Sequence, residues 1–267
     1  MKIFFSDLDG TLLNSKKVIT PKTADAIDTW LSNGNILALS SGRPLNSILE
    51  VIQANNLNRS GVYAIAFNGA QIYNVNEEKI ISTKSLSPEL AKDIINTVKM
   101  RNYYCHTYDN SHIIVSKTAP ETVFYTKTIH LPVRELEHFP EDIETAPCKI
   151  LCIDLNDNNT LSDFGIELEK TYKGLITCVK SNPHLLEIFP ISSGKGAAVT
   201  DFCKLMNVSK KDTLASGDEQ NDLSMLNEVQ ISIAMKNGND ILKHNATIIS
   251  ETDNDNDGLA QYFHTYL

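Results

Sequence analysis

The sequence of 267 residues lacks a long apolar run and any segment that resembles a secretory leader. No uninterrupted apolar stretch approaches the ~18 residues that a membrane-spanning helix requires. Met1 leads straight into a strand-like segment, without the basic and then apolar regions of a signal peptide. We therefore expect no membrane partner.

Cysteine is scarce, and its pattern is not that of a disulfide framework. The five cysteines are odd in number, lie mostly inside apolar runs and form no C-x-x-C pair. We expect them to be reduced core residues of a cytoplasmic protein.

An excess of positive charge is also missing. Asp and Glu number 33 against 24 Lys and Arg, which gives a formal net charge of -9. Nucleic-acid binding needs a basic face to neutralise phosphates, so this balance argues against a nucleic-acid partner. A small phosphorylated substrate stays possible, because a local cation site can reverse the potential of one cleft.

Apolar strands alternate with amphipathic helices at both ends of the chain. Residues 2–5, 35–39 and 62–67 form short apolar runs, and a helix is expected to begin at Pro21 with Thr20 as its cap. This alternation predicts an α/β fold with a doubly wound parallel sheet, in which ligands bind beyond the carboxyl ends of the strands.

The pattern changes in the middle of the chain to helices mixed with shorter alternating strands. We therefore predict a discontinuous Rossmann-like core formed by residues 1–83 and 186–267, with an inserted α+β domain over residues 84–185. The inserted domain contains His106 and Tyr108, side chains that could contact a substrate but are more often structural.

The first polar cluster follows the first apolar strand. Asp7 and Asp9 are two residues apart, so strand alternation would place both carboxylates on one side, roughly 7 Å apart. One carboxylate could attack phosphorus as a nucleophile, and the other could protonate the leaving group and then activate water. The alternative that both aspartates only cap a turn stays open at this point.

Two further clusters offer groups that bind phosphate. Ser41 and Gly42 follow the second strand, where a hydroxyl and backbone N–H groups can receive phosphate oxygens, although a plain turn has the same composition. Lys195 stands between two glycines at a predicted helix start, either as a clamp on a phosphoryl group or as a solvated lysine. It is not a Walker A lysine, because Phe189 and Gly196 occupy positions that this motif reserves for glycine and Ser or Thr.

The last cluster is acidic. Asp218, Asn221 and Asp222 follow another predicted strand, and ligands made only of oxygen suit Mg²⁺. A helix cap is the simpler alternative for either aspartate. Each of the four clusters follows an apolar strand or begins a helix, and their joint occurrence favours a single site over four unrelated turns.

Together these motifs resemble the haloacid dehalogenase (HAD) superfamily of phosphatases. The resemblance is carried by residues 7–11, 41–43, Lys195 and 217–222, while residues 68–70 and 233–235 resemble the Cof-type branch. It implies a HAD core with a large inserted α/β cap and covers nearly the whole chain. Gly194 departs from the pattern, because a polar residue is more usual before the lysine.

The resemblance also implies a role for each matching residue. Asp7 would be the nucleophile and Asp9 the acid/base, with Mg²⁺ held by the Asp7 carboxylate, the Asp9 carbonyl and Asp218. Asp222 would orient Lys195 or a water bound to the metal. The phosphate would be held by Leu8, Ser41, Gly42, Lys195 and Asn221, with Arg43 and Asn68 in support.

The sequence thus predicts a Mg²⁺-dependent phosphatase that hydrolyses a small phosphorylated metabolite, with a sugar phosphate as the expected substrate, through an aspartyl-phosphate intermediate. A phosphomannomutase-like phosphosugar mutase and a non-catalytic phosphate-binding regulator are the alternatives, and Asp9 argues against the second. We expect a monomer or a small homo-oligomer.

One motif fits none of these roles. Residues 253–258 match the first half of an EF-hand loop, but His264 stands where the bidentate glutamate should be. We expect a solvated acidic loop there.

Overall fold

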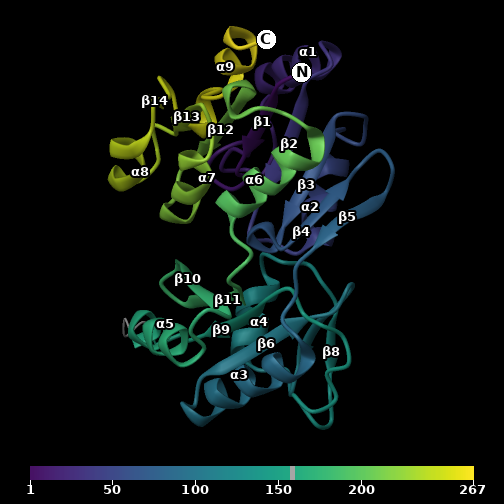
Figure 1. The fold of residues 1–267 in the computed structure, drawn as a ribbon, viewed down its shortest axis with the longest axis vertical. Coiled ribbons are helices and arrows are strands. Elements are labelled where there is room, and N and C mark those ends of the chain that lie inside the picture. The colour runs from purple at the N-terminus through teal and green to yellow at the C-terminus, as the bar shows by residue number, and fades with distance from the viewer. Residues whose placement is uncertain (157–159) are drawn as a thin grey trace. The chain divides into compact units, whose positions relative to one another are not determined.

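The computed structural model describes residues 1–156 and 160–267, which divide into two compact units. The first unit combines residues 1–82 with 194–267, and the second consists of residues 83–193. Figure 1 shows the chain coloured by residue number, so that both ends of the sequence are seen to build the first unit. The two ends lie close together there, since Lys2 Nζ donates to the backbone carbonyls of Tyr266 and Leu267.

The first unit is built on a sheet of eight strands among the described residues, in the order β14-β13-β12-β1-β2-β3-β4-β5. Neighbouring strands from β14 to β3 run parallel, and β4 pairs antiparallel with β3. This sheet and its helices confirm the predicted doubly wound α/β fold. The strands are β1 (Ile3–Ser6), β2 (Ile36–Ser40), β3 (Val62–Ala66), β4 (Gln71–Asn74), β5 (Lys79–Thr83), β12 (Thr213–Gly217), β13 (Ile231–Ala234) and β14 (Ile248–Ile249).

Helices cover both faces of this sheet because the central strand β1 is apolar on both sides. Phe4 stacks on Phe263 with ring centroids 4.4 Å apart and meets the edge of Trp30, whereas Phe5 packs against Phe202. The helices of the unit are α1 (Pro21–Ser32), α2 (Leu45–Ala54), α6 (Lys195–Met206), α7 (Leu223–Asn227), α8 (Asp240–Asn245) and α9 (Ala260–Thr265).

Helix α1 begins at Pro21 as expected, but Thr20 does not cap it through its side chain. The Thr20 hydroxyl instead contacts the Thr23 hydroxyl and donates to the Asp257 carboxylate. Thr20 is thus the N-cap residue by position, as predicted, but its hydroxyl binds a partner 237 residues away instead of the first N–H groups of the helix.

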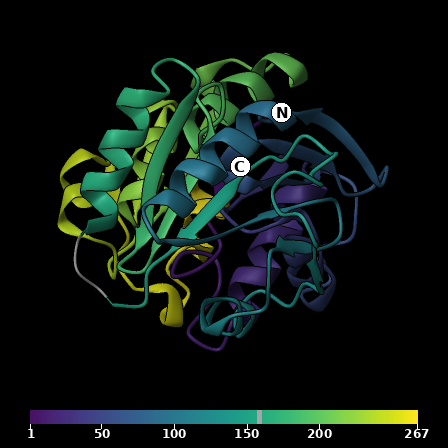
Figure 2. The same ribbon diagram turned by 90° about the horizontal axis from the view of Figure 1, so that it is seen from below.

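The second unit has a mixed sheet in the order β10-β11-β9-β6-β7-β8 over the described residues. Helices α3 and α5 lie on one face of it (Figure 2). Ile94, Phe164 and Ile188 belong to the hydrophobic cluster that these helices form with the sheet. Its strands are β6 (Tyr104–Tyr108), β7 (Ile113–Val115), β8 (Val133–Glu135), β9 (Ile150–Ile153), β10 (Ile176–Asn182) and β11 (Leu185–Pro190), and its helices are α3 (Pro88–Met100), α4 (Pro120–Thr126) and α5 (Thr160–Thr171).

The chain returns to the first unit later than residue 186. Strand β11 pairs antiparallel with both β9 and β10, so its ladder hydrogen bonds bind it to the second sheet. The apolar run at residues 185–190 therefore belongs to the second unit, and the first unit resumes at Gly194.

The five cysteines are all free thiols, and Cys105, Cys148 and Cys152 are buried. Within the described residues, every helix is too short or too polar to cross a bilayer.

Candidate active site

Three polar segments meet at the carboxyl edge of the first sheet. Strand β1 pairs in parallel with β2 on one side and β12 on the other, with Ser6 opposite Leu39 and Ser216. Asp7, Ser41 and Asp218 follow these three strands, so the parallel register brings them to one edge.

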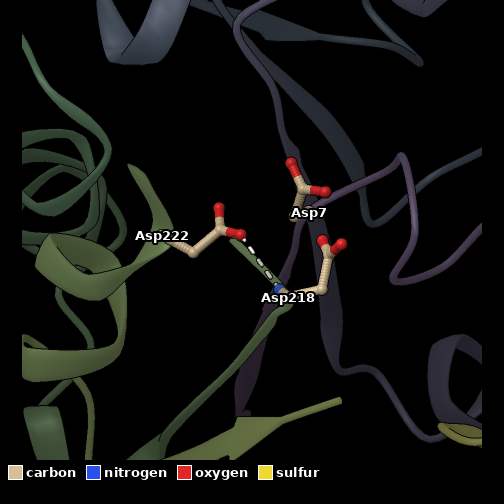
Figure 3. Close-up of side chains that lie close together, drawn as sticks. All are labelled: Asp7, Asp218 and Asp222. Atoms are coloured by element: carbon tan, nitrogen blue, oxygen red, sulfur yellow. Dashed lines mark hydrogen bonds between the residues drawn. The ribbon is translucent and has the colours of Figure 1, made fainter. Parts of the chain in front are cut away.

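Asp7, Asp218 and Asp222 form a buried carboxylate cluster in which one oxygen from each residue lies within 4.8 Å of the others. Figure 3 shows their side chains converging from β1 and from the segment after β12. The Asp222 carboxylate accepts the backbone N–H groups of Asp218 and Glu219 at 3.1 and 3.2 Å. Asp222 is thus held in place, while the cluster offers the oxygen-only ligand set that Mg²⁺ prefers.

Lys195 brings a positive charge into this cluster from the first residue of α6. Its ammonium donates to Asp7 Oδ1 at 2.6 Å and to Asp222 Oδ1 at 2.5 Å, and its side chain is 1% exposed. Burial would lower the pKa of Lys195, but the Asp222 and Asp7 carboxylates raise it above its ordinary value. The lysine is therefore a fixed cation and not the solvated side chain of the simpler alternative.

One ammonium facing three carboxylates leaves the cluster short of positive charge. Burial, followed by the Asp222 carboxylate, raises the pKa of Asp218 to about 7. Burial and the charges of Asp222 and Asp218 also raise the pKa of Asp7, against the opposing effect of Lys195. A bound cation would remove this repulsion, so the residues present fit a divalent metal ion.

Two glycines allow the backbone to approach the cluster. Gly10 has φ +80°, and a Cβ there would lie 2.3 Å from Asp218 Oδ2. At Gly196 a Cβ would lie 2.5 Å from the Ser224 carbonyl oxygen, where α6 passes α7. A larger residue at Gly10 would push its loop away from Asp218, and one at Gly196 would push α6, which carries Lys195, away from α7.

The Asp9 side chain follows the end of strand β1 and is bound by two cations. Strand β1 ends at Ser6, so Asp9 belongs to the following loop and is not bound by the alternation of a strand. The Arg43 guanidinium binds both of its oxygens, at 2.8 and 2.7 Å, and Lys17 Nζ lies 2.7 Å from Oδ1. Strand alternation therefore gives no support to the expectation that Asp7 and Asp9 share a side, and that expectation stays a prediction.

These ion pairs keep Asp9 ionised. Burial would raise the pKa of Asp9, but the hydrogen bonds and charges of Arg43 and Lys17 lower it below its ordinary value. The sequence did not single out Lys17, because an exposed lysine in a loop carries no motif. For Asp9 to donate a proton, one of its oxygens must first exchange its cationic partner for a proton.

The remaining candidate phosphate ligands lie at the same sheet edge or in the segments next to it. The Ser41 hydroxyl accepts the Arg43 N–H at 3.2 Å, and the Asn68 N–H donates to the Ser41 carbonyl at 3.0 Å. Asn68 is buried with φ 54°, and Leu8 is fully buried. Gly42 follows Ser41 directly, while Asn221 is half-buried in the turn after Asp218.

His106 and Tyr108 are core residues of the second unit. They are 0% and 3% exposed, and His106 Nε2 lies 2.9 Å from the Tyr108 hydroxyl. Burial, and to a smaller extent Lys149, lowers the pKa of His106 to about 3. The structural interpretation of these two side chains therefore holds.

The fold and this site define the chain as an α/β protein with a carboxylate-rich centre at the carboxyl edge of its mainly parallel sheet. A family model described as haloacid dehalogenase-like hydrolase matches residues 4–263. The chain belongs to this family, as its motifs indicated, and it is an enzyme of the phosphatase type.

Similar proteins support the same assignment. The 5-amino-6-(5-phospho-D-ribitylamino)uracil phosphatase YwtE of Bacillus subtilis is 27% identical, with 100% of this chain and 98% of that protein covered. Phosphatase YwpJ of the same organism is 25% identical over 97% of this chain and 98% of its own length. The crystal structure of a haloacid dehalogenase-like hydrolase from Bacteroides thetaiotaomicron superposes with a TM-score of 0.88 at 26% identity, covering 100% and 99% of the two chains.

Proposed function

We propose that this protein is a Mg²⁺-dependent phosphatase that hydrolyses small phosphorylated metabolites, sugar phosphates first among them, through an aspartyl-phosphate intermediate. The observation that carries the proposal is the buried arrangement of Asp7, Lys195 and Asp218 at one sheet edge. Lys195 lies 2.6 Å from Asp7, close enough to offset the charge of the attacking carboxylate.

Mg²⁺ would be held by the Asp7 and Asp218 carboxylates and the Asp9 backbone carbonyl. When bound, it would neutralise charge on the phosphoryl oxygens and orient the group for in-line attack. Asp222 is engaged by Lys195 and two backbone N–H groups, which supports a role in positioning Lys195.

The proposed reaction has two displacement steps. An Asp7 carboxylate oxygen attacks phosphorus, the bond from phosphorus to the ester oxygen breaks, and the leaving oxygen takes a proton from Asp9. Water then attacks the phosphorus of the aspartyl phosphate and gives a proton to Asp9, which releases inorganic phosphate and restores Asp7. Ser41, Gly42, Lys195 and Asn221 would hold the phosphoryl oxygens throughout.

The name of one similar protein supports the proposed substrate class. YwtE is named for a phosphorylated ribityl compound, in which a sugar-like chain carries the phosphate. The site itself offers groups for a phosphoryl oxygen and a cation, so the metabolite end must be identified by experiment.

A phosphate-release screen with and without Mg²⁺ tests the proposal. Its panel should contain hexose and pentose phosphates, a ribityl phosphate, nucleotides and p-nitrophenyl phosphate. We expect release from sugar or sugar-alcohol phosphates without a bisphosphate activator. Activity that requires such an activator, or isomerisation without release, would instead support the phosphosugar mutase.

Removal of the metal should silence the enzyme. With excess EDTA, p-nitrophenyl phosphate hydrolysis should fall to background, and added Mg²⁺ should restore it, because the carboxylate cluster lacks positive charge without a cation. Mg²⁺ should also raise Tm in proportion to its binding to the folded state. Hydrolysis that survives excess EDTA would show that the metal assignment is wrong.

Asp9→Asn should separate the acid role from the nucleophile. We expect kcat on alkyl phosphates to fall by about 10² to 10⁴-fold, the usual contribution of general acid–base catalysis. The phosphorylation step with p-nitrophenyl phosphate should suffer less, because its leaving group needs no proton, and intact mass should then reveal trapped phosphoenzyme.

Lys17→Ala is the matched control for Asp9→Asn. It removes one ion pair of Asp9 but keeps the carboxyl group, so the dependence on leaving group should follow that of the wild type. If Asp9→Asn lowered the rate equally for alkyl phosphates and for p-nitrophenyl phosphate, the result would argue against Asp9 as the general acid.

A further inference from the structure

The acidic turn at residues 253–257 contacts the loop that follows the candidate nucleophile. The Asn254 side chain donates to the Leu13 carbonyl at 2.8 Å, and the Asp255 carboxylate accepts the Ser15 N–H at 2.7 Å. The Asp257 carboxylate accepts the Thr20 hydroxyl. The turn therefore binds this loop at three points, and the two partners of each contact are more than 230 residues apart in the sequence.

Asn237 adds a fourth point of attachment, nearest the site. Its Nδ2 donates to the Gly10 carbonyl at 2.7 Å, while its Oδ1 accepts the Asn254 N–H at 3.2 Å. The Asn237 side-chain amide thus connects the acidic turn to the peptide group between Gly10 and Thr11.

The attached loop touches the carboxylate cluster directly. The Thr11 hydroxyl donates to Asp218 Oδ1 at 2.9 Å, and the α-carbon of Gly10 packs against the same carboxylate. A shift of the Gly10 peptide would therefore move both the Asp9 carbonyl and a neighbour of Asp218.

The side-chain oxygens of the turn are used within the chain. Asp253 Oδ1 accepts the Asp255 N–H and the Asn256 amide, and the other two aspartates bind loop residues 15 and 20. This pattern differs from a calcium loop, where the carboxylates converge on one ion. It indicates instead that the turn organises a neighbouring segment.

We propose that Asn237 and Asn254 are positioning residues, which hold the carbonyls of Gly10 and Leu13 so that the loop carrying Asp9 stays aligned with Asp218. The inference rests on the proposed function for its kinetic part. Its structural part, the alignment of a loop beside a carboxylate cluster, does not depend on the substrate.

The test compares Asn237→Ala, Asn254→Ala and Asn237→Asp with the matched control Asn256→Ala. Asn256 lies in the same turn, but within the described part of the chain its side-chain amide donates only to Asp253. Asn237→Asp keeps the acceptor for the Asn254 N–H but replaces the donor to Gly10 with a charged carboxylate oxygen, which repels the Gly10 carbonyl. Because Asn237 is exposed, its replacement should leave the fold intact.

Three quantities should change together. Amide hydrogen exchange of residues 10–20 should accelerate, and the Mg²⁺ concentration for half-maximal thermal stabilisation should rise by about tenfold, as for groups that orient metal ligands. On a sugar phosphate, kcat should fall by roughly 10 to 100-fold with little change in KM, because misplaced groups slow the reaction rather than weaken binding. The control should match the wild type in all three.

Several outcomes would overturn the proposal. If residues 10–20 of Asn254→Ala exchange their amide hydrogens at the wild-type rate, the contact between Asn254 and Leu13 does not hold the loop. Faster exchange with unchanged Mg²⁺ dependence and kcat would reduce the turn to a structural role, and equal effects in Asn256→Ala would show a general loosening. A wild type that is inactive but binds Mg²⁺ more tightly than Asn237→Ala would refute the phosphatase proposal and leave the positioning role standing.

Discussion

Asp7→Asn should lower kcat by about 10⁴-fold or more, the scale on which enzymes lose activity when their nucleophile is removed. The amide has the shape of the carboxylate but cannot form the phosphoenzyme, and it is a poorer metal ligand. Asp7 is only 7% exposed, so bulk water has little room to replace it as the attacking group.

The same substitution should not unfold the protein. Burial and two neighbouring carboxylates raise the pKa of Asp7, which means that its ionised form is disfavoured in the folded state. A neutral amide removes that repulsion, while Lys195 keeps its bond to Asp222. We therefore expect Tm to stay the same or rise as activity disappears.

Steady-state kinetics and intact mass after incubation with substrate are the measurements. Asp28→Asn is the matched control, because Asp28 is an exposed aspartate of the same unit that forms an ion pair with Arg59 and should keep wild-type turnover when replaced. Measurable turnover by Asp7→Asn, once contaminating phosphatase is excluded with a mock purification, would refute the covalent mechanism.

The proximity of Asp7, Lys195 and Asp218 was predictable because it follows from topology. Parallel strands share a carboxyl edge, so polar residues directly after β1 and β12 must lie near one another whatever their rotamers. Lys195 begins a helix that packs against the same sheet, which brings its side chain within reach. The chemical roles of these residues stay predictions.

The orientation of Asp9 was not predictable, because the alternation rule depends on where the strand ends. Strand β1 stops at Ser6, and beyond it the side chain turns to the strongest local partner, here the paired donors of Arg43. Which cation reaches a loop carboxylate is decided by tertiary packing and leaves no periodic signal in the sequence.

The contacts of the acidic turn at residues 253–257 could not be predicted for a similar reason. Its composition matched a partial calcium motif, but two of its side chains bind the backbone groups of Leu13 and Ser15. Every residue offers the same backbone groups, so a side chain that binds backbone atoms does not require a particular residue type as its partner. Such a contact therefore cannot be predicted from the residue types in the sequence. The late return of the chain at Gly194 likewise depended on the pairing of β11, which an apolar run alone does not specify.

Lys195→Met should destabilise the protein as well as inactivate it. The substitution leaves Asp7 and Asp222 buried without the ammonium that binds both, and breaking such a pair costs about 3 to 5 kcal/mol. In a domain of this size, about 1 kcal/mol corresponds to roughly 2 to 4 °C, so Tm should fall by roughly 6 to 20 °C. Turnover should be lost because the phosphoryl clamp is gone.

Mg²⁺ should recover part of this stability, which distinguishes a charge defect from a packing defect. Without the ammonium, the carboxylates face one another, and a divalent cation gains more by binding between them. The rise in Tm on addition of Mg²⁺ should therefore be larger in Lys195→Met than in the wild type.

Lys149→Met provides the matched control for that comparison. Lys149 is equally buried, 1% exposed, and its ammonium lies 2.9 Å from Glu187 in the second unit. Its loss should also destabilise the protein by taking the ammonium away from a buried carboxylate, but the predicted metal ligands all belong to the first unit. Differential scanning calorimetry of both variants with and without Mg²⁺ should thus show an enlarged Mg²⁺ increment in Lys195→Met and a wild-type increment in Lys149→Met. Equal increments in the two variants would show that Lys195 and the metal do not share the cluster of Asp7, Asp218 and Asp222.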